Sequence, residues 1–299
     1  MDWKGFLQWK KHPYIPILSF CLLIFTGQMV SSCFTFSISE KEVYTHFKKS
    51  DLQPQVKSYE ALGRKIHYVE VGNDTAQMVV FVHGAPGSLS EFLDFLTDST
   101  LTSKARIIST DRPGYGYSGF GQSEISIERQ AAMLLPILKT NRSSKLPILV
   151  GHSYGGTVIA RMAMDYPEHV GALVMAAPAI DPENEKFFWV NRPADWWGIR
   201  WMVPRSMRVA NDEKLSHVQQ LKLMLPYWDK ITAPTTIIHG EADSLVPYAN
   251  ALFGKNMLKN APVQTVTQSD MGHLIPWQHP DVLRNAIFYY LEDTVSSRQ

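Results

Sequence analysis

Short apolar runs recur along the chain after residue 60, and longer amphipathic segments separate them. Residues 65–71 alternate between apolar and polar side chains, as a half-buried strand does, whereas residues 78–82 are apolar throughout, as in a strand covered on both faces. The other runs that predict strands are 106–110, 148–150, 172–176, 235–239 and 263–267, and helical patterns lie near 90–96, 125–138, 157–163 and 280–291. This alternation predicts an α/β fold with a mostly parallel β-sheet and helices on both faces.

One interval breaks the alternation. Residues 179–230 contain helical and loop patterns, many aromatic side chains and no run that predicts a strand. We therefore expect a small helical cap at 179–230, inserted after the sixth strand between two parts of one core, 61–178 and 231–299. Most aromatic side chains of the cap should pack its own small core, because they contribute mainly through buried area. A minority should face a site beneath the cap; the candidates for substrate contact are Trp189, Trp196, Trp197 and Trp201.

The N-terminal segment has the pattern of a targeting sequence. Three lysines precede a stretch from residue 13 to residue 39 that contains no charged side chain. Residues 1–32 are thus predicted to be a signal peptide or a membrane anchor, in an exported and membrane-associated protein. Val30-Ser31-Ser32-Cys33 resembles the lipobox of bacterial lipoprotein signal peptides, in which the cysteine is lipidated. An uncleaved transmembrane anchor and simple secretion remain open, since the stretch is long enough to span a bilayer.

Residues 33–60 are polar and mixed in charge, and we interpret them as a tether, although a charged surface strand or a short helix fits equally well. The 299-residue chain has 29 basic and 28 acidic residues, and this balance argues against a nucleic-acid partner. Its 10 histidines lack the spacing of metal ligands, and no cofactor or metal is expected. The expected partners are a small-molecule substrate and, through the N-terminal segment, a membrane.

The segment with the clearest chemistry begins with the apolar run 147–150. This run leads directly into Gly151-His152-Ser153-Tyr154-Gly155, and an apolar helical pattern follows. Ser153 is therefore predicted on a sharp strand-to-helix turn, which glycines permit because they lack a Cβ atom. Such a turn exposes the serine hydroxyl, so Ser153 is the candidate nucleophile.

Four further motifs accompany this turn in chain order. They are His83-Gly84-Ala85-Pro86, the turn-rich segment 111–118, Gly240-Glu241-Ala242-Asp243 and Gly272-His273. Together with the serine turn and the cap, the set resembles the α/β-hydrolase family whose lid lies between strands six and seven, over residues 61–295. The resemblance implies a catalytic triad in the order serine, acid, histidine.

In such a triad a histidine activates the serine, and a buried carboxylate fixes the tautomer of the histidine. His273 follows the last predicted strand, as the catalytic histidine of the family does, and Asp243 follows the preceding strand. Asp181 and Glu241 remain alternatives for the acid. The segment 111–118 is interpreted as structural, because its proline and glycine residues mainly specify a turn.

The resemblance also implies an oxyanion hole made of two backbone N–H groups, those of Tyr154 and Ala85. His83 and Gly84 are expected to shape the supporting loop, in which Pro86 cannot donate a hydrogen bond.

A serine nucleophile favours acyl transfer to water over the chemistry of epoxide hydrolases and dehalogenases, which carry an aspartate at this position. We expect hydrolysis of a carboxylic ester of a small or medium, largely apolar substrate through an acyl-enzyme intermediate. An aminopeptidase or amidase resembling proline iminopeptidases, in which Glu183 and Glu185 could hold an amine, remains open. A carbon–carbon bond hydrolase and a non-catalytic binding protein also remain open.

Overall fold

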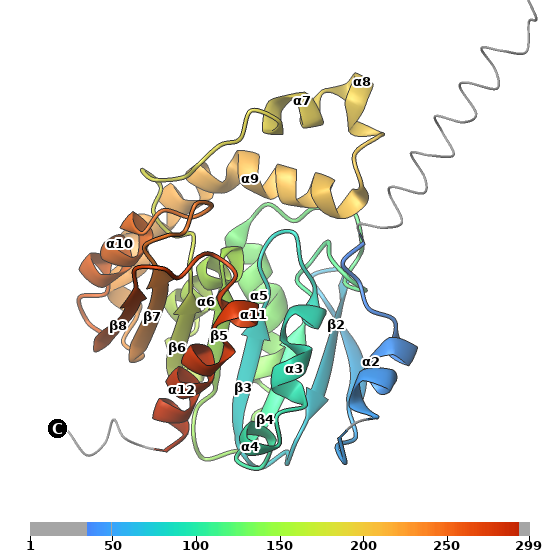
Figure 1. Ribbon diagram of the computed structural model, residues 1–299, viewed down its shortest axis with the longest axis vertical. Helices are drawn as coiled ribbons and strands as arrows, with labels where there is room; N and C mark the ends of the chain where they lie inside the picture. The colour runs from blue at the N-terminus through green and yellow to red at the C-terminus, as the bar shows by residue number, and fades with distance from the viewer. Residues whose placement is uncertain (1–34, 49, 293–299) are drawn as a thin grey trace, which may run out of the picture.

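The computed structural model describes residues 35–48 and 50–292, which form a sheet of eight strands with helices on both faces (Figure 1). The strand order is β1-β2-β4-β3-β5-β6-β7-β8. The pairs β1/β2 and β2/β4 are antiparallel, and the other five pairs are parallel. The strands are β1 (Gln55–Ala61), β2 (Arg64–Val71), β3 (Gln77–Val82), β4 (Ala105–Thr110), β5 (Ile148–His152), β6 (Ala172–Ala176), β7 (Thr235–Gly240) and β8 (Val263–Gln268). The predicted mostly parallel sheet is confirmed.

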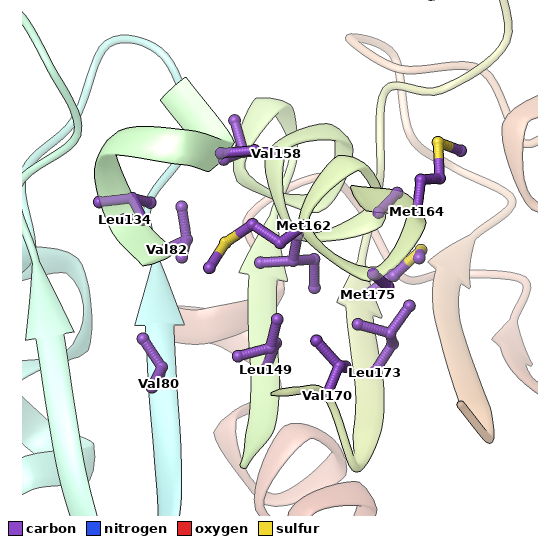
Figure 2. Packing of buried hydrophobic residues seen from close by; sticks show 14 of the residues in the cluster. Val80, Val82, Leu134, Leu149, Val158, Met162, Met164, Val170, Leu173 and Met175 are labelled. Carbon is purple, nitrogen blue, oxygen red and sulfur yellow. The ribbon is translucent and has the colours of Figure 1, made fainter. Parts of the chain in front are cut away.

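Helices cover the two faces of the sheet, and side chains alternate between them. Along β3, Val80 and Val82 pack under helices α5 and α6 (Figure 2). Val79 and Phe81 pack in a second cluster on the opposite face. The helices are α2 (Glu40–Phe47), η1 (Leu89–Phe92), α3 (Leu93–Leu96), α4 (Ser99–Thr102), α5 (Ile127–Leu138), α6 (Tyr154–Asp165), η2 (Pro167–His169), α7 (Asn191–Asp195), α8 (Trp197–Arg200), α9 (Arg205–Met224), η3 (Leu225–Lys230), α10 (Ala249–Met257), α11 (Ile275–Gln278) and α12 (Pro280–Leu291). The prediction that the apolar run 78–82 forms a strand covered on both faces is therefore confirmed.

The segment interpreted as a tether belongs to the fold instead. Helix α2 begins with a capping box, in which Ser39 and Glu42 bond to each other's backbone N–H groups. Val43 and Phe47, four residues apart on one face of this helix, are buried in the second cluster. Strand β1 pairs along its whole length with β2. The structure thus shows the short helix and strand that the sequence had left open, and not a tether, because two apolar side chains in a charged segment are enough to fix a short helix on the core.

Helices α7, α8, α9 and η3 lie between β6 and β7, and the described residues of this interval contain no strand. In Figure 1 this insertion lies above the sheet, with α9 next to the core and α7 and α8 beyond it. The insertion therefore occupies the position predicted for the cap.

Among residues 35–48 and 50–292, no helix is long and apolar enough to cross a membrane. The predicted signal peptide or anchor and the candidate lipidation site Cys33 lie outside the described residues.

Candidate active site

The turn between β5 and α6 holds Ser153 in a backbone conformation that few non-glycine residues adopt, with φ of 53° and ψ of −120°. Gly151 and Gly155 in this turn have no room for a side chain. A Cβ atom on Gly155 would lie 2.0 Å from the carbonyl oxygen of Val82, and one on Gly151 would lie 2.5 Å from the carbonyl oxygen of Gly155. The Ser153 amide donates a hydrogen bond of 2.9 Å to Ala176. The sharp turn expected from the sequence is present.

The loops after β7 and β8 bring an acid and a histidine together. The Nδ1 atom of His273 lies 2.7 Å from Oδ2 of Asp243. The other oxygen, Oδ1, accepts hydrogen bonds from the backbone N–H groups of Leu245 and Val246, at 2.9 and 2.8 Å. Because the carboxylate is held on both sides, Asp243 fixes the ring of His273, and His273 and Ser153 line the same cavity.

The two other candidate acids lie elsewhere. The carboxylate of Asp181 accepts hydrogen bonds from the Glu183 amide and the Asn184 side chain, at 2.9 and 2.7 Å, and so closes a local turn. Glu241 is exposed to solvent. Of the three candidates, only Asp243 contacts His273.

Burial and charge both shift the titration of this pair. Burial alone would raise the pKa of Asp243, but the imidazole of His239, whose Nε2 atom lies 3.5 Å from Oδ2, and the hydrogen bond to His273 outweigh burial and hold this pKa well below its ordinary value. For His273, burial lowers the pKa; the hydrogen bond to Asp243 opposes the shift, and the charge of nearby His152 adds to it. A neutral His273 beside an ionised Asp243 is the state in which a histidine can accept a proton from a serine.

Ala85, in the glycine loop after β3, lines the cavity that Ser153 also lines. The preceding amide, that of Gly84, is already occupied, because it donates to the carboxylate of Glu91 at 3.2 Å. Tyr154 is the first residue of α6, where backbone N–H groups have no partner within the helix. Ala85 and Tyr154 thus stay the candidate oxyanion donors.

The side chain of His83 stabilises this loop through hydrogen bonds to the backbone. Its Nε2 atom accepts a hydrogen bond of 2.9 Å from the Arg112 amide, so the ring proton is on Nδ1, which donates to the carbonyl oxygen of Gly84 at 2.7 Å. Burial, with Arg112 adding to it, lowers the pKa of His83 well below its ordinary value. His83 is therefore a neutral loop residue, as expected from the sequence.

The four cap tryptophans do not line the cavity. It has a volume of about 290 Å³ and lies between the insertion and the core. Its lining residues are Ala85, Pro86, Ser153, Phe188, Val190, Asn191, Ala194, Val203, Met207, Ala210, Asn211, Lys214, Leu245, Val246 and His273. Trp189, Trp196, Trp197 and Trp201 are instead exposed, by 54% to 85%. The prediction that some of these tryptophans line the cavity was wrong because α7 and α8 are too short and irregular to enclose such large side chains.

A larger hollow of about 600 Å³ beside α2 contains none of the site residues.

Sequence reasoning also missed a buried ion pair that joins the glycine loop to the insertion. Arg112, interpreted only as part of a turn, donates to the carbonyl oxygens of His83 and Gly84 at 2.9 and 3.0 Å. The same guanidinium binds Glu213 of α9 through two hydrogen bonds of 2.6 and 3.0 Å. Both side chains are fully buried. Arg112 thereby positions the loop that carries Ala85, and nothing in the sequence pairs it with a residue 101 positions away.

We expect Glu213→Gln to destabilise the protein by about 3 kcal/mol or more, because it leaves the buried Arg112 charge without a counter-charge. Chemical denaturation measures the loss. The matched control is Glu128→Gln: the exposed Glu128 pairs with Arg161, which keeps a second ion pair with Asp165, so this substitution should change the free energy of unfolding by less than about 1 kcal/mol. Equal effects of the two substitutions would contradict this assignment.

A second missed group lies behind Ser153. The Nδ1 atom of His152 is 2.7 Å from Oε1 of Glu91, and its Nε2 atom is 3.0 Å from the carbonyl oxygen of His273. At this separation Glu91 and His152 form a buried ion pair whenever the imidazole is protonated. Burial alone would lower the pKa of His152, but the Glu91 carboxylate raises it above its ordinary value. The ring of His152 also lies beside that of His273, with ring centroids 4.9 Å apart.

The lowered pKa of His273 predicts that activity survives into mildly acidic solution. The base must be neutral, so kcat/KM should fall only as the pH drops below about 6.5, the ordinary pKa of histidine. The charge of His152 lowers the pKa of His273, so His152→Gln, which removes that influence and leaves Asp243 in place, should move the acid limb to higher pH. The pH profile of kcat/KM checks both statements. A wild-type limb above pH 6.5, or a shift to lower pH in the variant, would oppose them.

Within residues 35–48 and 50–292, no three His, Cys, Asp or Glu side chains lie close enough together to hold a metal ion.

Two family models match the chain. The model of the α/β hydrolase fold matches residues 77–199, and that of the prolyl oligopeptidase family matches residues 141–293. With the sheet order and the serine turn, these matches show that the chain belongs to the α/β-hydrolase family.

Individual relatives are distant. A probable 1-acylglycerol-3-phosphate O-acyltransferase from Oryza sativa subsp. japonica is 34% identical over 42% of this chain and 32% of its own length. A 2-hydroxy-6-oxononadienedioate/2-hydroxy-6-oxononatrienedioate hydrolase from Pseudomonas sp. is 26% identical over 76% of this chain and 91% of its own length. The chain spans between 32% and 55% of the length of the first three curated relatives that it matches.

Among solved structures, a putative lipase from Acinetobacter baumannii AYE has a TM-score of 0.66 at 20% identity, over 88% of this chain and 98% of that chain. This similarity shows a shared fold.

Proposed function

We propose that the protein is a serine hydrolase that cleaves a carboxylic ester of a small or medium, largely apolar substrate. The observation that carries this proposal is the Asp243–His273 hydrogen bond at the edge of a cavity that Ser153 also lines. An aspartate that fixes a histidine beside an exposed serine is the arrangement needed for nucleophilic attack on a carbonyl group.

The steps follow from the roles of these groups. His273 accepts the proton of the Ser153 hydroxyl as the oxygen attacks the substrate carbonyl, and Asp243 stabilises the cationic ring that forms. The amides of Ala85 and Tyr154 donate to the oxyanion of the tetrahedral intermediate. His273 then gives its proton to the leaving alcohol, which leaves an acyl group on Ser153. Water activated by the same histidine releases the acid.

The walls of the cavity favour an apolar acyl group. Apart from the triad residue His273, the one titratable lining residue is Lys214, and its ammonium group is paired with the buried carboxylate of Glu185. At about 290 Å³ the cavity lies at the lower end of the volumes that hold small ligands.

We expect kcat/KM for p-nitrophenyl esters to rise from acetate toward medium chain lengths, by up to about fourfold for each CH₂ group that becomes buried. The rise should stop when the cavity is full. Met207→Ala enlarges the cavity and should move the optimum to longer chains, whereas Trp189→Ala, outside the cavity, should leave the profile unchanged. A flat or falling profile, with aminoacyl anilides cleaved faster than any ester, would contradict the ester proposal.

Peptide or amide hydrolysis is the second candidate, favoured by the match of residues 141–293 to the prolyl oligopeptidase family. The acidic cap residues give it little support. Glu185 is paired with Lys214 and His217; burial alone would raise the pKa of its carboxyl, but these two partners outweigh burial and hold this pKa below the ordinary value. Glu183 is exposed. Neither carboxylate is therefore available in the cavity to hold a substrate amine.

We also propose export and membrane association through residues 1–32, which rests on the charge and hydropathy pattern of the sequence alone. The intact mass of the purified protein distinguishes an acylated chain that begins at Cys33 from a chain that begins at Met1.

A further inference from the structure

The outer part of the insertion exposes an unusual amount of aromatic surface. The side chains of Trp189 and Trp197 are 85% and 83% exposed, and those of Trp196 and Trp201 are more than half exposed. Helices α7 and α8 contain no buried residue. Figure 1 shows both helices on the side of α9 that faces away from the sheet. Clusters of exposed large apolar side chains on a folded protein mark surfaces of interaction.

The same stretch is strongly basic. Residues 186–208, here named the tryptophan segment, contain five basic residues and one acidic residue, in a chain whose net charge is +1. Arg192 and Arg205 are exposed. Burial lowers the pKa of Arg208, and the charges of Arg200 and Arg205 lower it further; Arg200 is itself paired with Asp195 and Asp212. The Nε atom of Arg208 has no hydrogen-bond partner among the described residues.

This combination matches one kind of partner. Indole rings favour the boundary between the lipid headgroups and the acyl chains, and arginine and lysine side chains are attracted to anionic headgroups. We propose that the tryptophan segment docks on the surface of an anionic lipid bilayer. A second copy of the chain fits less well, because a two-fold contact would place this positive surface against itself.

Docking would also bring the bilayer close to the site. Val190, Asn191 and Ala194 belong to the tryptophan segment and line the cavity that contains Ser153. The segment that docks thus also supplies one wall of the cavity, which would hold Ser153 close to a membrane that contains esters with apolar acyl chains. This consequence for the substrate rests on the proposed ester hydrolysis, whereas the docking itself does not.

Fluorescence quenching of the full chain tests the docking without any turnover. The probe is a vesicle of phosphatidylcholine and phosphatidylglycerol with brominated acyl chains, which quench an indole on contact. The wild type should lose more fluorescence emission on vesicle binding than Trp189→Phe/Trp197→Phe, and the difference should equal the emission of these two indoles. Trp228→Phe, which removes an indole that is 2% exposed, should leave the quenched emission unchanged. Arg192→Gln/Arg205→Gln should weaken quenching by the vesicles that contain phosphatidylglycerol, but not quenching by vesicles of phosphatidylcholine only. Added salt should have the same effect.

Equal quenched emission in the wild type and in the double tryptophan variant would overturn the proposal. So would a wild-type dimer that the double tryptophan variant loses, with no quenching by vesicles, because that result assigns the surface to a second copy of the chain. Since no outcome depends on catalysis, a failure of docking and a failure of the proposed hydrolase function are distinguishable.

Discussion

Replacement of Ser153 by alanine is expected to lower kcat for the best ester substrate by about 10⁴-fold or more. The hydroxyl is the attacking group, and the members of a triad act as a unit, so no neighbouring side chain replaces it. The residual rate should still exceed that of water, because the amides of Ala85 and Tyr154 remain in place.

Ser58→Ala is the matched control, since Ser58 lies on β1, in the antiparallel edge of the sheet away from the turn after β5. It should retain the wild-type kcat. Retention of more than about a hundredth of the wild-type kcat by Ser153→Ala would exclude this serine as the nucleophile.

Replacement of Asp243 by asparagine is expected to lower kcat by about 10³- to 10⁴-fold. An asparagine at this position can donate a hydrogen bond to His273 Nδ1, which stabilises the tautomer with its proton on Nε2. That tautomer cannot accept the proton of Ser153. Because the cavity is unchanged, KM should change far less than kcat, and steady-state kinetics separate the two effects.

Asp181→Asn serves as the comparison, because Asp181 is also a buried aspartate after a strand but makes its hydrogen bonds within a local turn. It should leave kcat nearly unchanged. A large loss in Asp181→Asn with a small loss in Asp243→Asn would move the orienting acid to the loop after β6.

The parts of the fold that the sequence predicted are those with a local cause. The apolar run of β3 and the two glycines around Ser153 each have one structural interpretation, because a doubly covered strand and a turn without space for Cβ atoms restrict the side chains strongly. The order of Ser153, Asp243 and His273 relative to the strands was predictable for the same reason.

The parts that could not be predicted depend on partners far away in the chain. Helix α2 is fixed by Val43 and Phe47 against a core built from later strands. The role of Arg112 depends on its ion pair with Glu213, and that of His152 on its contact with Glu91. Residue spacing in the sequence indicates neither pairing. The exposure of Trp189 and Trp197 depends on how much of the insertion lies beneath them, which side-chain type alone does not determine.

The most direct test of the central claim is to trap the nucleophile. The full chain is incubated with a fluorophosphonate and digested, and the modified peptide is located by mass spectrometry. The account predicts one stoichiometric adduct on Ser153, formed slowly in Asp243→Asn and absent in Ser153→Ala. An adduct on another residue, or equal labelling of the wild type and Ser153→Ala, would contradict it.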